Sequence, residues 1–131
     1  MSMGVSPGRG LRVLMAEDEW LAAEVLAEGL ADAGFTVLTA RDGLAALEMA
    51  AGGEPFDLLL TDLRMPRMDG RELIARLRAD RPDLPVVVMT GFPPPDGAGA
   101  LHGGEAPLRL LTKPIGIAPL VAALRAVAGL N

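Results

Sequence analysis

The sequence contains no cysteine and few aromatic residues, and each shortage excludes a class of structure. Without cysteine the protein has no disulfide, no thiolate metal site and no cysteine nucleophile. Only 3% of its 131 residues are aromatic, so the core must be built from aliphatic side chains, a bias that suits buried parallel strands. No segment approaches the roughly 18 consecutive apolar residues of a membrane helix. We therefore expect one aliphatic domain in a reducing cytoplasm.

Basic charge is also scarce. The formal net charge at pH 7 is −5, and Lys and Arg do not cluster beyond the interleaved stretch "RELIARLR", which argues against a nucleic-acid partner. The first residues, "MSMGVSPGRG", lack the apolar core of a signal peptide. We interpret residues 1–10 as a flexible leader and residues 11–131 as a single folded domain.

Short apolar runs alternate with segments of helical periodicity along the chain. The helix predicted over residues 70–80, for example, places its leucines and isoleucine on one face and leaves Arg78 outside with the other arginines. With short links between elements, the alternation predicts an α/β fold, a five-stranded parallel sheet doubly wound by right-handed crossovers. Strands are predicted at residues 11–16, 35–40, 56–61, 85–90 and 108–112, and helices at residues 20–33, 42–50, 70–80 and 117–130.

Proline and glycine concentrate in one segment. Residues 91–107, "GFPPPDGAGALHGGEAP", carry four prolines and five glycines, a composition that disfavours a helix. The helix that would connect the fourth and fifth strands is therefore predicted to be weak or absent. His102 lies in this segment and is interpreted as an exposed loop residue. Trp20, at the start of the first predicted helix, is expected to pack that helix onto a neighbour or to be partly exposed.

Polar residues follow the carboxyl ends of four predicted strands. Glu17 and Asp18 follow the first strand and Asp62 follows the third, while Thr90 closes the fourth and Lys113 follows the fifth. Because the carboxyl ends of parallel strands line one crevice, we expect these side chains to converge. Three carboxylates in one crevice repel each other unless a cation shares the site. Oxygen ligands without histidine or thiol favour Mg²⁺.

This set of groups matches the needs of phosphoryl transfer. Asp62 is the best-placed nucleophile, Lys113 can neutralise a dianionic group on it, and Thr90 can donate a hydrogen bond to another oxygen. Each residue alone also has an ordinary interpretation, such as a helix cap, a surface lysine or a strand threonine. Their joint placement at successive strand ends is what favours a reactive site.

Four motifs occupy these strand ends in a spacing that is highly specific in combination. They are "MAEDE" after the first strand, "LLLTDLRMPRMDG" at the third, "VVVMTG" at the fourth and "LLTKPI" at the fifth. Through them the chain resembles, over residues 11–130, the receiver domains of two-component response regulators. The resemblance implies the flavodoxin-like strand order 2-1-3-4-5 and a phosphoprotein of a phosphorelay signalling system.

The resemblance also implies roles for the acidic residues. Asp62 matches the phosphoacceptor, which takes a phosphoryl group from a histidine kinase or a histidine phosphotransfer protein. Glu17 and Asp18 resemble the acidic pair that holds Mg²⁺, with Asp18 favoured as the direct ligand. Asp62 and the backbone carbonyl of Arg64 match further metal ligands. A protein of this type phosphorylates and dephosphorylates itself at one site and is not a turnover enzyme.

The remaining positions of the family pattern are partly matched. Thr90 resembles the switch hydroxyl and Lys113 the family's lysine, with a cis peptide bond expected between Lys113 and Pro114. Leu110 stands where the family usually has an aromatic switch residue, so coupling by rotation of an aromatic ring is not expected. Residues 93–107 are similar to a subgroup of single-domain receivers with a loop in place of the fourth helix, which suggests a readout through loop ordering.

Two residues are expected to set the lifetime of the phosphorylated form. Arg64 and Phe92 lie two positions after the acceptor and the threonine, where the family tunes the attack of water. Their bulk suggests a long-lived phosphoform.

Three alternatives remain at the level of sequence. An aspartyl phosphatase of the haloacid-dehalogenase type would need an Asp two residues after Asp62, where Arg64 stands. A flavodoxin-like cofactor module would need a glycine- and hydroxyl-rich phosphate loop, where the acidic stretch "EDEW" stands. The third is a receiver-shaped interaction module that is never phosphorylated. No effector sequence follows the last helix, so we expect output through contacts with a protein that the sequence does not name.

Overall fold

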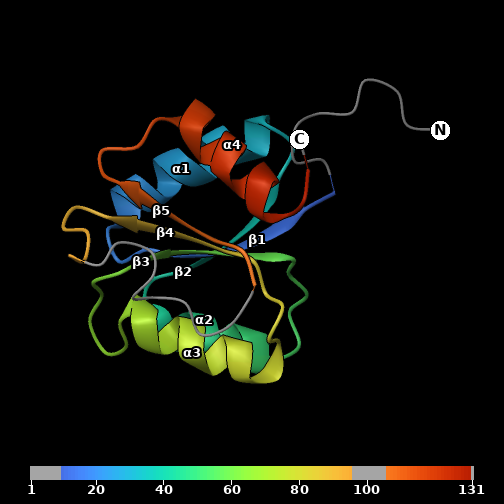
Figure 1. The fold of residues 1–131 in the computed structure, drawn as a ribbon, viewed down its shortest axis with the longest axis vertical. Helices are drawn as coiled ribbons and strands as arrows, with labels where there is room; N and C mark the ends of the chain where they lie inside the picture. The colour runs from blue at the N-terminus through green and yellow to red at the C-terminus, as the bar shows by residue number, and fades with distance from the viewer. Residues whose placement is uncertain (1–9, 96–105, 131) are drawn as a thin grey trace.

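The computed structural model describes residues 10–95 and 106–130. It contains one parallel sheet in the order β2-β1-β3-β4-β5, with α1 and α4 on one face and α2 and α3 on the other (Figure 1). This confirms the predicted doubly wound α/β fold and its strand order. The strands are β1 (Arg12–Ala16), β2 (Thr36–Ala40), β3 (Leu58–Asp62), β4 (Val86–Thr90) and β5 (Leu108–Thr112), and the helices are α1 (Trp20–Asp32), α2 (Gly43–Ala51), α3 (Gly70–Asp80) and α4 (Ile117–Val127).

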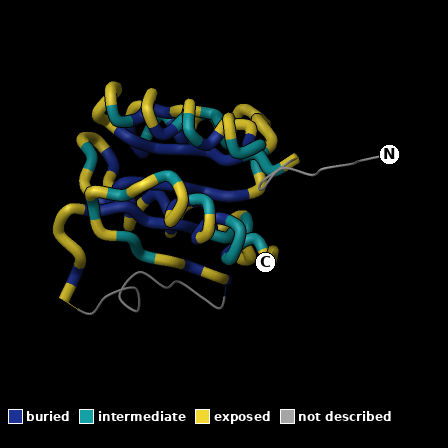
Figure 2. The backbone as a smooth tube through the Cα atoms, turned by 90° about the horizontal axis from the view of Figure 1, so that it is seen from above, coloured by how far each residue is buried: buried dark blue, intermediate teal, exposed yellow. Residues whose placement is uncertain are grey.

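The sheet separates two hydrophobic cores. Successive residues of a strand point to opposite faces, so Leu59 packs with the core under α2 and α3, while Leu58 and Leu60 pack with the core under α1 and α4. Both faces are covered, which explains why the central strands are apolar without alternation. All five residues of β3 and of β4 are buried, and Figure 2 shows the strands enclosed between helices whose outer faces are exposed.

Local sequence signals explain where the helices begin. Asp42 precedes α2 and accepts a hydrogen bond from the Ala45 backbone N–H at 2.8 Å, and Asp69 precedes α3 and accepts one from Glu72 at 2.9 Å. Both are N-caps, which satisfy backbone donors that have no partner inside the helix. The predicted helix at residues 42–50 therefore begins one residue later than expected.

Arg78 corrects one prediction. The helical pattern placed it outside, but its residue is only 6% exposed. Its guanidinium donates to the backbone carbonyls of Leu84 at 3.0 Å and Pro107 at 3.0 Å, and burial lowers the pKa of Arg78. The long side chain reaches backbone carbonyls of two loop segments that lie outside its own helix, which helical periodicity alone does not reveal. Arg78 thus joins α3 to the residues that precede β4 and β5.

Several predictions concern residues at the margins of the described chain. The flexible leader falls mainly on residues 1–9, and the proposed replacement of a helix by a loop falls mainly on residues 96–105, as does His102; these residues lie outside the described ones. Trp20 is 67% exposed, which agrees with the partly exposed alternative. Among the described residues, none of the helices has the length and apolarity needed to cross a membrane.

Candidate functional site

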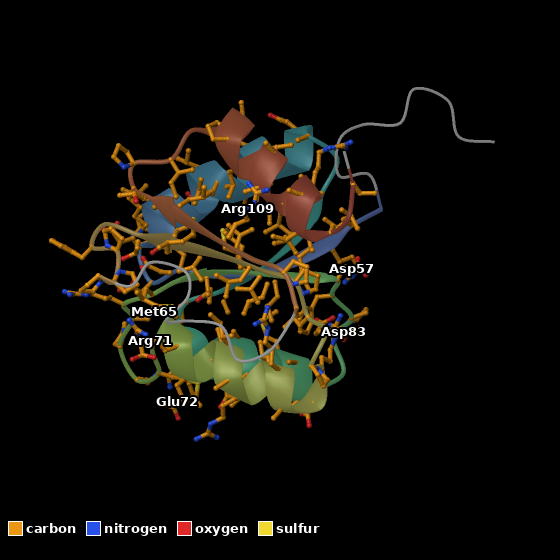
Figure 3. All side chains as sticks on the ribbon, in the orientation of Figure 1. Asp57, Met65, Arg71, Glu72, Asp83 and Arg109 are labelled. Atoms are coloured by element: carbon orange, nitrogen blue, oxygen red, sulfur yellow. The ribbon has the colours of Figure 1, made fainter. Side chains whose placement is uncertain are left out.

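The predicted site residues gather at the carboxyl end of the sheet. Met65, in the turn that follows β3, lies at the end of the molecule opposite Asp57 and Asp83, which precede β3 and β4 (Figure 3). Asp62 is itself the last residue of the central strand β3, and it pairs in register with Met89 of β4. Because the strands are parallel and paired in register, their carboxyl ends lie together at one end of the sheet, as expected.

Lys113 connects two of the carboxylates. Its Nζ donates to Asp62 Oδ2 at 2.6 Å and to Glu17 Oε1 at 3.0 Å, although these residues lie 51 and 96 positions away in sequence. The backbone N–H of Lys113 donates to the carbonyl of Thr90 at 2.8 Å, which places the lysine beside the end of β4. The implied cis bond between Lys113 and Pro114 is present.

Burial and pairing shift the ionisation of these groups. Burial acts to lower the pKa of Lys113, but its hydrogen bonds with Asp62 and Glu17 outweigh that effect and raise it. The pKa of Glu17 is raised because burial disfavours its charged form, and the neighbouring charge of Asp62 adds to the rise. Hydrogen bonds from the Glu19 backbone and from Lys113 offset part of it. The lysine is therefore firmly charged, while the carboxylates remain in excess.

The carboxylates of Glu17, Asp18 and Asp62 fit a divalent cation. One oxygen from each lies within 4.8 Å of the others, with Glu17 and Asp62 buried and Asp18 exposed. Among the described residues, the ammonium of Lys113 is the one cation that donates to any of these three carboxylates, so negative charge is in excess there. A hard oxygen donor set beside a solvent-exposed carboxylate suits Mg²⁺, which retains several waters.

The turn after β3 contacts Asp62 and the segment after β4. The backbone N–H of Arg64 donates to Asp62 Oδ1 at 3.2 Å, and the Arg64 guanidinium lies 4.9 Å from the centroid of the Phe92 ring. The backbone N–H of Phe92 in turn donates to Thr90 Oγ1 at 3.1 Å. A hydroxyl that accepts one hydrogen bond still carries its own donor proton. The two residues predicted to tune hydrolysis therefore stack on each other beside the site. The role of the Arg64 carbonyl stays a prediction.

Leu110 belongs to a hydrophobic core and not to the set of polar side chains described above. It is half-buried in β5 and packs against the core under α2 and α3. The position where the family usually has an aromatic ring is thus occupied here by an aliphatic side chain that packs against the core.

Two residues near the site were missed by the sequence analysis. Arg67, in the turn after β3, donates to both carboxylate oxygens of Asp42, at 2.7 and 3.0 Å. The pair with Arg67 lowers the pKa of Asp42, partly opposed by burial. The residues lie 25 positions apart, and no local pattern marks them as partners.

A groove beside α1 opens onto the site. It has a volume of about 540 Å³ and runs between α1 and the segment that follows β5. An exposed apolar ridge of α1 lines it. The ridge consists of Leu21 and Val25, whose side chains are each more than 60% exposed. The groove is lined in part by Glu17, Leu21, Val25, Lys113, Pro114 and Ile115.

Comparison with known proteins agrees with this geometry. The family model described as response regulator receiver domain matches residues 13–125. The transcriptional regulatory protein TcrA of Mycobacterium tuberculosis is 37% identical over 134 residues, which cover 97% of this chain and 52% of TcrA. The response regulator MprA of Mycobacterium ulcerans is 36% identical over 118 residues, with 89% and 50% covered. The chain thus spans about half the length of the curated relatives it matches.

Solved structures show the same fold. A response regulator receiver protein from Sinorhizobium medicae superposes with a TM-score of 0.82 at 27% identity, covering 91% of this chain and 94% of that one. The response regulator TrrA of Thermotoga maritima, solved in complex with Mg(2+)-BeF, has a TM-score of 0.76 at 24% identity, with 89% and 98% covered. By its sequence match and its fold, the chain belongs to the family of response regulator receiver domains.

Proposed function

We propose that this chain is a phosphoacceptor of a two-component system, which takes a phosphoryl group on Asp62 from a phosphohistidine. The observation that carries the proposal is the contact of Lys113 Nζ with Asp62 Oδ2 at 2.6 Å, beside two further carboxylates within 4.8 Å. The Asp62 carboxylate lies between the ammonium of Lys113 and two further carboxylates that can hold a cation. Two positive charges, the ammonium and a bound cation, can stabilise the negative charge of an acyl phosphate formed on Asp62. The donor is a histidine kinase or a histidine phosphotransfer protein.

The transfer balances as a single displacement. A carboxylate oxygen of Asp62 attacks phosphorus, a P–O bond forms and the P–N bond of the donor breaks. The electron pair of the P–N bond stays on the imidazole nitrogen. The other ring nitrogen of the donor carries a proton, so the leaving group is a neutral imidazole. Lys113 pairs with the charge that arrives on Asp62, and the Thr90 hydroxyl can donate to a phosphoryl oxygen. Hydrolysis by water later releases inorganic phosphate and restores the Asp62 carboxylate. We infer a phosphoacceptor that modifies and resets itself at one site, and not a turnover enzyme.

The acidic residues supply a place for Mg²⁺. Glu17, Asp18, Asp62 and the backbone carbonyl of Arg64 would hold it. When bound, it would neutralise charge on the phosphoryl oxygens. The Mg(2+)-BeF complex of the structurally similar TrrA supports this choice of ion.

The stacked Arg64 and Phe92 side chains support a slow loss of the phosphoryl group. The guanidinium lies 4.9 Å from the ring centroid, and the backbone of each residue is bonded to a site residue. We expect the pair to hinder the approach of water to the acceptor. We expect Phe92→Ala to shorten the lifetime of the phosphoform several-fold, measured by its decay after removal of the donor. A wild-type lifetime of only seconds would contradict this part of the proposal.

The groove beside α1 supports docking of the phosphohistidine donor. It shares Glu17 and Lys113 with the site, so a helix seated on the apolar ridge of α1 would bring its histidine to Asp62. An exposed apolar patch of this kind typically marks a protein contact. Because the groove shares two residues with the site, we assign it to the donor. We expect output through contacts with a second protein.

Intact mass after phosphorylation tests the proposal. Wild type and Asp62→Asn are incubated with acetyl phosphate and MgCl₂, and the wild type alone is expected to gain one phosphoryl group. Hydroxylamine, which cleaves acyl phosphates, is expected to remove it. An adduct in Asp62→Asn, or none in wild type, would refute the assignment, and the second result would favour an interaction module that is never phosphorylated. Multiple turnover of small phosphate esters would instead favour a phosphatase.

A further inference from the structure

The ion pair between Asp42 and Arg67 joins two segments that flank the candidate site. Arg67 lies in the turn between β3 and α3, and Asp42 directly precedes α2. The guanidinium donates from Nε to Asp42 Oδ2 at 2.7 Å and from Nη2 to Oδ1 at 3.0 Å. Two parallel bonds fix the orientation of the side chains as well as their separation. The pair is therefore a rigid connection between the turn and α2.

The backbone of Arg67 adopts a conformation that its residue type disfavours. Its φ is +68°, in the left-handed region, and no other non-glycine residue in the described ranges has a positive φ. A side chain with a Cβ pays a steric penalty there, so other interactions must hold the turn in this form. The two hydrogen bonds to Asp42 are such interactions.

The helix side of the connection is closely packed. A Cβ at Gly43 would collide with the backbone carbonyl oxygen of Met68, so glycine at this position allows α2 to touch the turn. Asp42 is only 4% exposed, and its Oδ1 also caps α2 through the Ala45 N–H at 2.8 Å. One buried carboxylate thus holds both the helix end and the turn.

The turn is also attached to the acceptor. The backbone N–H of Arg64 donates to Asp62 Oδ1 at 3.2 Å, and the N–H of Gly70 donates to the carbonyl of Leu63 at 2.8 Å. A Cβ at Gly70 would collide with the backbone carbonyl oxygen of Asp62. The two ends of the turn are thereby fixed, and Arg67 fixes its middle.

We propose that the Asp42–Arg67 pair positions the turn after β3, so that the backbone groups of Arg64 face Asp62 and the Mg²⁺ site. The inference rests on the proposed function, because these groups matter for chemistry only if Asp62 accepts a phosphoryl group with Mg²⁺. Without the pair the turn relaxes from its left-handed form, and the Arg64 carbonyl is no longer held for the metal. Asp42 and Arg67 act through this turn and are positioning residues, not catalytic ones.

Magnesium titration of the full chain tests the proposal. Asp42→Asn, Arg67→Ala and Arg67→Gly are compared with wild type by isothermal titration calorimetry with MgCl₂, and by the initial rate of phosphorylation by acetyl phosphate at increasing MgCl₂. Asn caps a helix as well as Asp, so Asp42→Asn removes the charged pair and keeps the cap. We expect each variant to bind Mg²⁺ about tenfold more weakly, with the phosphorylation rate largely recovered at saturating MgCl₂.

A double variant, a control variant and a folding check identify the cause of any loss of Mg²⁺ affinity. The double variant Asp42→Asn/Arg67→Ala is expected to be no weaker than either single variant, because one interaction is lost in all three. Arg76→Ala, which breaks the exposed pair with Glu72 on α3, is the matched control and should bind Mg²⁺ within about twofold of wild type. Circular dichroism confirms that each variant is folded at the temperature of the titration, and Asp42→Asn carries the test if Arg67→Ala is unfolded.

Two results would overturn the inference. Wild-type affinity in Asp42→Asn would show that the charged pair does not position the turn. Wild-type affinity in Arg67→Gly would show that the turn needs only a left-handed φ, which glycine adopts freely. These outcomes leave the proposed function intact, whereas a wild type that takes neither Mg²⁺ nor a phosphoryl group refutes both.

Discussion

Replacing Lys113 with methionine should destabilise the protein in a way that Mg²⁺ reverses. The substitution keeps most of the aliphatic stem and removes an ammonium that lies 2.6 Å from Asp62 Oδ2 and 3.0 Å from Glu17 Oε1. At an effective dielectric constant of roughly 20, each contact corresponds to a Coulomb energy of about 6 kcal/mol before desolvation is subtracted. Both carboxylates would remain buried without their shared cation.

The net cost is smaller than the Coulomb energy. Removing one partner of a fully buried pair costs about 3–5 kcal/mol, and the Lys113 side chain is 29% exposed, so solvent replaces part of the lost interaction. We expect Lys113→Met to lower the free energy of unfolding by about 2–3 kcal/mol in EDTA at pH 7. Urea unfolding followed by far-UV circular dichroism measures the difference.

Magnesium provides the specific test of this reasoning. Without the ammonium, a divalent ion meets less repulsion and should bind the variant more tightly than it binds wild type. A ligand at a hundred times its Kd stabilises by about 2.7 kcal/mol, so the stability gap between variant and wild type should narrow as MgCl₂ increases. If the difference in unfolding free energy between variant and wild type does not change with MgCl₂, the idea that Lys113 and the metal act on the same carboxylates is refuted.

An exposed ion pair supplies the control. Arg76 Nη2 lies 2.9 Å from Glu72 Oε2, but both side chains are about half exposed, at 55% and 49%. Arg76→Met should cost only about 0.3–0.5 kcal/mol, with no response to MgCl₂. The contrast would show that burial, and not the N–O distance, sets the energy of these pairs.

Three further predictions concern other parts of the molecule. Arg78→Met should lower the free energy of unfolding by about 2–3 kcal/mol, because the buried carbonyls of Leu84 and Ala106 lose their donor; urea unfolding at the wild-type value would contradict this. The lowered pKa of Asp42 contributes stability that is present above its unfolded value of 3.8 and lost as pH falls through the lower folded value. Asp42→Asn should therefore show a shallower loss of stability than wild type below about pH 3.8 in acid titrations, and parallel curves would argue against the assignment. Val25→Asp, on the exposed ridge of α1, should slow phosphorylation by a phosphohistidine donor while leaving acetyl phosphate labelling unchanged; equal loss with both donors would place the effect in the site instead of the groove.

The fold was predictable because its signals are local and repeated. The apolar runs at residues 56–61 and 85–90 lack alternation, which indicates strands covered on both faces. The structure confirms them as β3 and β4, within two residues at each end. The alternation of strands with helical segments then allows few topologies. The predicted ends differ from the observed ones by one or two residues, because Asp62 belongs to β3 itself and Asp42 is a cap.

The candidate site was predictable for a related reason. Parallel strands end at a common edge, so residues that follow successive strands meet even when they are far apart in the chain. Lys113 and Glu17 are separated by 96 positions and lie 3.0 Å apart. Knowing the element order was enough to place them together, and the identities of the side chains indicated the chemistry.

The interactions that hold the site in shape were decided only by tertiary packing. Arg67 finds Asp42 because α2 lies against the turn after β3, and Arg78 finds Pro107 because α3 reaches beneath the start of β5. The sequence pattern placed Arg78 on the outer face of its helix and marked no partner for Arg67. Whether a long cationic side chain extends into water or to a buried acceptor depends on which acceptors the fold places nearby. The sequence by itself therefore determined which residues meet at the sheet edge, because strand order does so, and the tertiary structure decided how their surrounding turns are held.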